Sequence, residues 1–149
     1  MRKMKVGKIT FTEAYKAVYE YRQKFPEKAV TFYAQNYPAM GWAVLMAGGS
    51  CPVIPCTDKA FLKDAAAMEV EETNTDEYKK MVKSDIGSII YSKSGTEIPV
   101  QLSSGKYSLK YIHPSSGKVT TIDKLLKIND VYTLKVPDKK EGIYWFHKL

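Results

Sequence analysis

Residues 89–119, "IIYSKSGTEIPVQLSSGKYSLKYIHPSSGKV", consist of short apolar or alternating runs that are interrupted by clusters of Ser, Gly and Pro. The interruptions fall at Ser94-Gly95, at 103–105 and at 114–117. Successive side chains of a strand point to opposite faces, whereas Gly, Pro and Ser favour the backbone conformations of tight turns. The segment therefore predicts antiparallel strands joined by short turns.

The same pattern continues to the C-terminus, again with turn residues between the runs. Short runs of this kind with closely spaced turns are typical of an antiparallel β-sandwich. We place this sandwich domain at residues 78–149. The predicted strands cover 86–93, 96–102, 106–113, 118–125, 131–136 and 142–149.

The first part of the chain predicts helices instead. Between Phe11 and Phe25 the apolar residues recur at three- and four-residue spacing, which lines one face of a helix. Thr10 and Glu13 fit a capping box at its start, and Pro26 ends it.

Two more helices are predicted upstream of the strands. One starts at residue 27, is kinked or restarted by Pro38, and ends where Gly48 and Gly49 can adopt positive φ angles. The other covers 58–68, with Thr57 as its cap. The inward residues at the start of the first of these helices are Val30, Tyr33, Ala34 and Tyr37.

The segment "SCPVIP", residues 50–55, predicts a short strand that is apolar on both faces, as in a parallel sheet covered by helices. Its two prolines do not suit the centre of an antiparallel sheet. The predicted fold class is therefore α+β: a helical segment with one barrel-like strand over residues 1–70, followed by the antiparallel β-sandwich. We interpret the acidic residues from Glu69 to Glu72 as a solvated linker.

The formal charge of +7 raises the question of nucleic-acid binding, because clustered basic residues neutralise phosphates. The lysines are scattered, and arginine occurs only at Arg2 and Arg22. A solvated lysine-rich surface explains the charge better, so we expect no nucleic-acid partner and keep a basic nucleic-acid-binding domain as an alternative.

Other functional classes find little support in the sequence. No apolar run approaches the roughly 20 residues of a membrane span, and the N-terminus has no signal-peptide pattern, so we expect no membrane partner and leave the localisation open. Cys51 and Cys56 lack partner ligands for zinc, and we favour free thiols over a local disulfide or a chemical role. His113 and His147 have no ligands at metal spacing, and Gly48-Gly49 is not a phosphate loop, so no metal or cofactor is predicted.

Two stretches resemble a known family. "GWAVLMAGGS", residues 41–50, resembles the stretch before the last strand of bacterial (β/α)8-barrel glycoside hydrolases. Residues 89–149 resemble the C-terminal β-sandwich of such proteins, often labelled a collagen-binding domain, with its "Y-x-x-x-G" strand, "W-Y-D-P-x-x-G" turn and aromatic last strand. The corresponding residues here are 91–95, 111–117 and 144–146, with His113 at the position where the family commonly has Asp.

The resemblance implies a non-catalytic role for this chain. A glycosidase needs two carboxyl groups that flank one bond, and a barrel supplies them from different strands of a domain of about 250 residues. This chain has room only for the last barrel strand, so we predict no catalytic residue and infer a fragment, a truncated gene product or a remnant module. The sandwich would stabilise the barrel or contact polysaccharide; a hydrolase completed by a partner chain is the alternative.

Three residues are candidates for contact with carbohydrate. Tyr107 and Tyr111 lie on one face of a predicted strand and could form an aromatic platform for sugar rings, although a sandwich also buries aromatic residues on one face. Asp58 would lie at a barrel mouth, but it also fits the first turn of a helix, where a carboxylate complements the helix dipole. Self-association through the unpaired edges of residues 51–55, or binding to a barrel partner, is expected as well.

Overall fold

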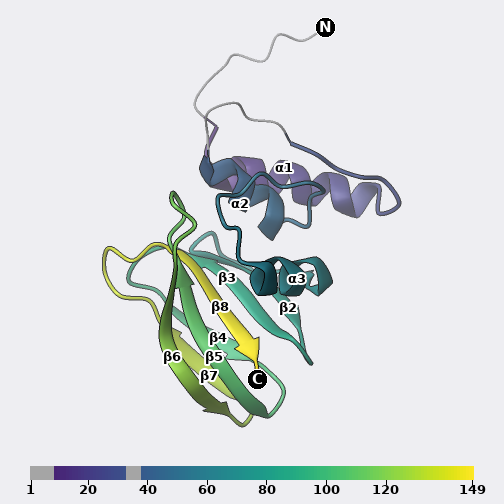
Figure 1. Cartoon of the computed structure of the whole chain (residues 1–149). Helices are drawn as coiled ribbons and strands as arrows, with labels where there is room; N and C mark the ends of the chain where they lie inside the picture. Colours follow the sequence, from purple (N-terminus) through teal and green to yellow (C-terminus); the bar gives the residue numbers. More distant parts are fainter. Residues whose placement is uncertain (1–8, 33–37) are drawn as a thin grey trace, which may run out of the picture. The chain divides into compact units, whose positions relative to one another are not determined.

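The computed structural model describes residues 9–32 and 38–149 (Figure 1). The chain divides into two compact units, Met1–Val53 and Ile54–Leu149. The α+β class predicted from the sequence is confirmed, with three short helices and antiparallel strands in two sheets. The domain limits of 1–70 and 78–149 remain a prediction, whereas packing separates the units between Val53 and Ile54.

The first helix of the first unit, α1 (Phe11–Lys24), begins as predicted. The Thr10 hydroxyl accepts a hydrogen bond from the Glu13 N–H at 3.2 Å, and the Glu13 carboxylate accepts one from the Thr10 N–H at 2.8 Å. This capping box satisfies two backbone donors that the helix itself leaves unpaired. Ala14, Tyr15 and Val18 form the buried side of the helix.

The second helix, α2 (Pro38–Met46), ends at the Gly-Gly pair. Gly48 has a φ of 75°, and its N–H donates to the Leu45 carbonyl while the Gly49 N–H donates to the Val44 carbonyl. These two bonds form a Schellman motif, which needs a left-handed residue at the first glycine. A Cβ on Gly49 would lie 2.5 Å from a methyl carbon of Val44, so this site accepts only glycine without a shift of its neighbours.

Two predictions for the first half of the chain are wrong. The described residues that follow α1, up to residue 32, form turns and irregular backbone rather than a helix. Val30 instead pairs with Ser50, which donates its N–H to the Val30 carbonyl at 2.7 Å. Tyr33, Ala34 and Tyr37 lie outside the described residues.

The barrel-like strand expected over residues 50–55 does not form either. Its two prolines have no N–H to donate to a ladder, and Cys51 has a φ of 52°, which is incompatible with an extended strand. The segment is irregular, and every strand pair in the described part of the chain is antiparallel.

The second unit begins with α3 (Lys59–Ala67). Its cap is Asp58 rather than the predicted Thr57, because the Asp58 carboxylate accepts the Phe61 N–H at 2.9 Å. Phe61, Asp64 and Ala65 form the buried side of this helix.

All six predicted strands are present, with ends that differ by a few residues. Two strands that were not predicted precede them and lie at one edge of the larger sheet. The larger sheet has the order β1-β2-β3-β8-β5-β6, and β4 pairs with β7 in a separate sheet. The strands are β1 (Glu69–Glu71), β2 (Tyr78–Lys83), β3 (Gly87–Ser92), β4 (Glu97–Gln101), β5 (Gly105–Ile112), β6 (Val119–Ile128), β7 (Val131–Lys135) and β8 (Gly142–Lys148).

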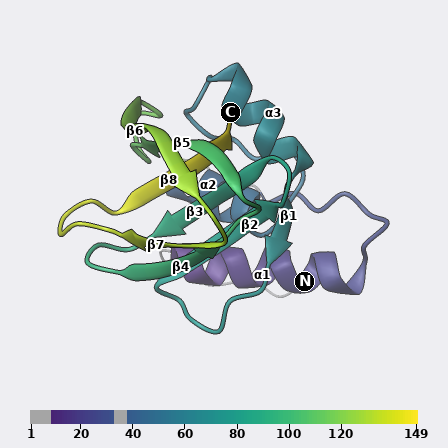
Figure 2. The same cartoon turned by 90° about the horizontal axis from the view of Figure 1, so that it is seen from below.

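The six-stranded sheet is covered differently on its two faces. Figure 2 shows α3 on one face, here called the outer face, and the β4–β7 pair on the other, the inner face. On the outer face Phe61 of α3 meets Trp145 of β8 edge to face, with ring centroids 5.4 Å apart. On the inner face the core includes Ile90, Tyr107, Leu109, Tyr144 and Phe146, packed with apolar residues of β4 and β7.

This arrangement makes α3 part of the β unit. We expect a chain of residues 54–149 to unfold cooperatively, whereas residues 78–149 alone lack the helix that covers Trp145 and expose an apolar outer face. Apolar-dye binding and urea unfolding of the two fragments test this expectation. Equal stability of the two fragments would contradict the assignment of α3 to this unit.

Candidate functional site

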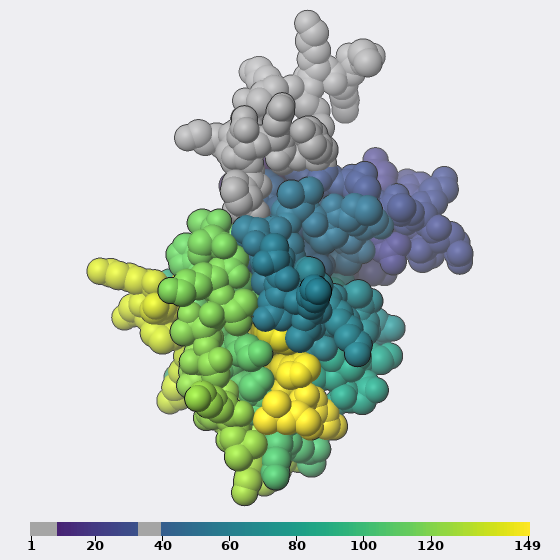
Figure 3. Space-filling model, viewed as in Figure 1, coloured from purple at the N-terminus to yellow at the C-terminus, as the bar shows by residue number. Residues whose placement is uncertain are grey.

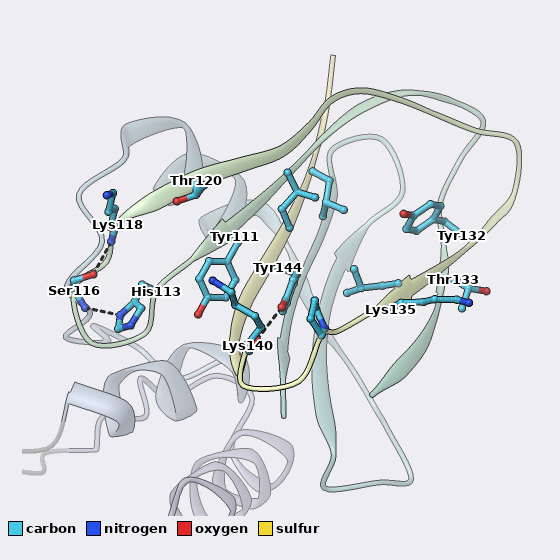
Figure 4. Close-up of a pocket in the computed structure, with 14 residues that line it drawn as sticks. Tyr111, His113, Ser116, Lys118, Thr120, Tyr132, Thr133, Lys135, Lys140 and Tyr144 are labelled. Carbon is cyan, nitrogen blue, oxygen red and sulfur yellow. Dashed lines mark hydrogen bonds between the residues drawn. The ribbon is translucent and has the colours of Figure 1, made fainter. Parts of the chain in front are cut away.

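A pocket of about 630 Å³ opens on the inner face of the six-stranded sheet (Figure 4). It forms because the two-stranded sheet covers only part of that face, so that most residues of β6 remain exposed. This inner pocket is bounded by β5, β6, β7 and the loop between β7 and β8. The lining residues are Leu109, Tyr111, His113, Ser116, Lys118, Thr120, Ile122, Tyr132, Thr133, Leu134, Lys135, Pro137, Lys140 and Tyr144.

The residues that line the inner pocket are of two kinds. Leu109, Leu134 and Tyr144 belong to the buried core and supply apolar surface. Other lining residues are polar, namely the Thr and Ser residues and Lys118, Lys135 and Lys140. Apolar surface with a few placed polar groups is the usual composition of a small-molecule or oligomer site.

Tyr111 contributes a half-buried aromatic ring to the inner pocket. Its hydroxyl donates to the Glu141 carbonyl at 2.9 Å, and its ring lies 5.4 Å from that of Tyr144 between centroids. Gly142 leaves room for the ring, because a Cβ there would lie 2.7 Å from it. The ring is therefore fixed in position before any ligand arrives.

Both tyrosines of this pair are neutral at physiological pH. Burial, with a smaller contribution from the Glu141 charge, raises the pKa of Tyr111. Burial, followed by the neighbouring Tyr111, raises the pKa of Tyr144 to about 12. The Tyr144 hydroxyl donates to the Lys140 carbonyl at 2.8 Å, which ties the β7–β8 loop to the sheet.

The turn at His113 shapes one end of the inner pocket. His113 Nδ1 accepts the N–H groups of Ser115 and Ser116 at 3.3 and 3.4 Å. An aspartate carboxylate at a turn of this kind accepts backbone N–H groups in the same way. The histidine thus takes over the structural role that the resemblance assigns to Asp.

The three predicted carbohydrate contacts lie in different environments. Tyr111 lines the inner pocket, whereas Tyr107 is 0% exposed in the core and its hydroxyl donates to the Ser103 carbonyl at 2.7 Å. Tyr107 therefore offers no face to a ligand, and the structure does not contain the predicted platform of two outward rings. Asp58 caps α3 and is not among the residues that line the inner pocket.

One signal in the sequence could have separated the two tyrosines, namely which part of β5 has apolar neighbours over it and which part has polar ones. Residues 107 and 111 point to the same side of the strand, but Tyr107 belongs to the buried core cluster, whereas Tyr111 is only partly buried against it. The polar residues of β6 opposite Tyr111, such as Thr120, indicate in the sequence that this end of the face is open.

A second pocket, of about 420 Å³, lies on the outer face beside a buried carboxylate. One oxygen of Asp64 accepts the Trp145 indole N–H at 2.9 Å and lies 2.7 Å from His147 Nδ1. The side chain of Asp64 is only 8% exposed. Figure 3 shows the C-terminal end of β8, in yellow, at the surface beside α3, and the His147 side chain is 31% exposed.

The outer pocket is better explained by packing than by catalysis. A glycosidase needs two carboxyl groups in different protonation states. Asp85 is the other carboxylate that lines the outer pocket, and it lies in an exposed turn. Asp64 holds two donors of the sheet with one oxygen, so its geometry is that of an anchor for α3.

Among the described residues, the two cysteines form no disulfide and the potential metal ligands form no metal-binding group. Cys51 is exposed, Cys56 is buried, and both are free thiols. Burial raises the pKa of Cys56 and so lowers its reactivity. Within residues 9–32 and 38–149, no group of three or more His, Cys, Asp or Glu side chains could hold a metal ion.

Comparison with known proteins gives a partial and distant likeness. Residues 1–68 match the family described as "Domain of unknown function (DUF6298)", and this match ends at the C-cap of α3. A solved structure named "Glycoside hydrolase" is similar at a TM-score of 0.41 and 12% identity, over 53% of this chain and 19% of that chain. At this TM-score the likeness carries no argument about the site.

The search for similar curated proteins found no match. None of the helices in the described part of the chain is long and apolar enough to cross a membrane.

The contacts of Asp64 predict a large effect on stability. Asp64→Ala leaves the buried Trp145 N–H without an acceptor, and we expect it to lower the free energy of unfolding by about 2–3 kcal/mol. Urea unfolding followed by fluorescence measures the change. Asp85→Ala, in the exposed turn of the same pocket, is the matched control and should change stability by less than about 0.5 kcal/mol; equal effects of the two substitutions would contradict the anchoring role.

Proposed function

We propose that the unit Ile54–Leu149 is a non-catalytic module of a glycoside-hydrolase-like protein and that it contacts polysaccharide in the inner pocket. The observation that carries the proposal is the fixed aromatic ring of Tyr111 in an open pocket with polar groups around it. Sugar rings have apolar C–H faces that stack on aromatic rings and hydroxyl groups that hydrogen-bond at their edges. The inner pocket offers partners for both.

The volume and the construction of the inner pocket support a ligand rather than a packing defect. Its volume of about 630 Å³ lies within the range of ligand sites. Two hydrogen bonds fix its walls, from Tyr111 to Glu141 and from Tyr144 to Lys140. When a ligand enters a pre-formed pocket, the protein loses little conformational entropy, which favours binding.

The resemblance to barrel-associated sandwiches supports the same proposal. In such proteins catalysis belongs to the barrel, and this module would hold a polysaccharide near it or stabilise the barrel. The outer pocket does not favour a hydrolase, because Asp64 is occupied in anchoring α3.

The test is a loss of glycan binding on removal of the ring. We expect Tyr111→Ala to weaken binding roughly five- to tenfold, since the lost stacking amounts to about 1 kcal/mol. Tyr111→Phe keeps the ring but loses its hydrogen bond to Glu141, so it should weaken binding clearly less than Tyr111→Ala does. Affinity electrophoresis against a panel of soluble neutral and acidic polysaccharides, followed by calorimetry on those that bind, measures the effect.

Two controls make this test specific. Tyr21→Ala removes an aromatic ring that is 59% exposed on α1, outside the inner pocket, and should leave binding unchanged. The melting temperature of Tyr111→Ala shows whether the variant is folded. Absence of binding to every polysaccharide, or equal binding by folded Tyr111→Ala, would overturn the proposal and leave the unit as a packing module.

A further inference from the structure

The charged residues that line the inner pocket are all basic. Lys118, Lys135 and Lys140 line it, and no Asp or Glu is among the described residues that do so. Figure 4 shows Lys118 and Lys135 on opposite sides of the pocket, with Lys140 and Tyr111 between them. We infer that the inner pocket binds an acidic glycan, a polysaccharide whose sugar rings bear carboxylate groups, in preference to a neutral one. This inference rests on the function proposed above and names the class of ligand for the same site.

The lysines are available for a ligand. Among the described residues, Lys118 and Lys140 form no ion pair with a carboxylate. Lys135 pairs with Glu97 at 3.6 Å, but the two side chains are 77% and 68% exposed. An exposed pair of this kind contributes little and is screened by salt, so a ligand carboxylate can replace it.

Glu141, the acidic residue beside Tyr111, does not line the inner pocket. The Glu141 carboxylate accepts a hydrogen bond from the hydroxyl of Tyr91, which lies on the outer face. The Glu141 carbonyl accepts the Tyr111 hydroxyl, and the Glu141 charge makes the smaller contribution to the raised pKa of Tyr111. The tyrosines themselves add no negative charge: a phenol is protonated at neutral pH, and burial raises the pKa of Tyr111 and Tyr144 further.

The positions of the charges fit a sugar ring better than an isolated anion. Lys140 Nζ lies over the Tyr111 ring, 5.5 Å from its centre, so the ammonium group has to move toward the edge of the ring when a sugar stacks there. A uronate ring presents a stacking face and, at its edge, a carboxylate that this ammonium can reach. The other two lysines lie apart from this point, where the neighbouring acidic rings of a polymer would extend.

A matched pair of ligands tests the inference. Polygalacturonate oligomers and their methyl esters have the same backbone and differ only in charge. We expect the acid to bind at least about tenfold more tightly at low salt, and this preference to shrink as salt rises. Lys118→Gln/Lys140→Gln should weaken binding of the acid about tenfold and binding of the ester by less than about twofold.

The control is the double variant Lys16→Gln/Lys24→Gln, which removes the same charge from α1. It should leave the affinity for the acid unchanged. Equal affinity for acid and ester, with both lost in Tyr111→Ala, would overturn the acidic preference and keep the proposed function. Binding of neither form nor of any other polysaccharide would overturn both. Tighter binding of duplex DNA than of the acid, lost in the pocket double variant, would assign the lysines to phosphate and also overturn the inference.

Discussion

The fold of the second unit depends on one buried carboxylate. Asp64 of α3 accepts the indole N–H of Trp145 and pairs with His147, which lie 81 and 83 residues further along the chain. A buried carboxylate is costly unless donors satisfy it, and here β8 supplies both donors from alternate positions on one face. The interaction therefore fixes where α3 lies and which face of β8 points outward.

The face of the sheet on which α3 lies determines where a pocket can form. With α3 on the outer face, the inner face receives only the two strands β4 and β7, and six strands cannot be covered by two. The apolar core forms beneath β4 and β7, whereas β5 and β6 extend beyond them and leave the inner pocket. The inner pocket is thus a consequence of unequal layers, and lysines on the turns and strand ends around it set its charge.

The sequence predicted the elements whose formation depends on the local pattern of apolar, polar and turn residues. The six strands from β3 to β8 follow from alternation and turn residues, and the capping box of α1 follows from Thr10 and Glu13. Strand β2 was missed because Lys79 and Lys80 resemble solvated residues, whereas both are buried with their ammonium groups on the carbonyls of Thr75 and Pro99.

The sequence did not predict which residues of a strand are buried by segments that lie far away along the chain. Tyr107 and Tyr111 share one face of β5, yet Tyr107 belongs to the buried core, whereas Tyr111 packs against that core and lines the pocket. The apolar composition of residues 50–55, their prolines and the resemblance to a barrel predicted a strand there, although a strand also needs a partner and free N–H groups.

The most direct test of this account is the position of a bound glycan. Backbone amide resonances recorded during titration with an acidic oligosaccharide should shift at Tyr111, at 113–120 and at 132–140, around the inner pocket. The amides of α3 and of His147, beside Asp64 on the outer face, should remain unchanged. Shifts confined to α3 and the end of β8 would contradict the account, because they would place the ligand in the outer pocket, against the side chain that holds the fold together.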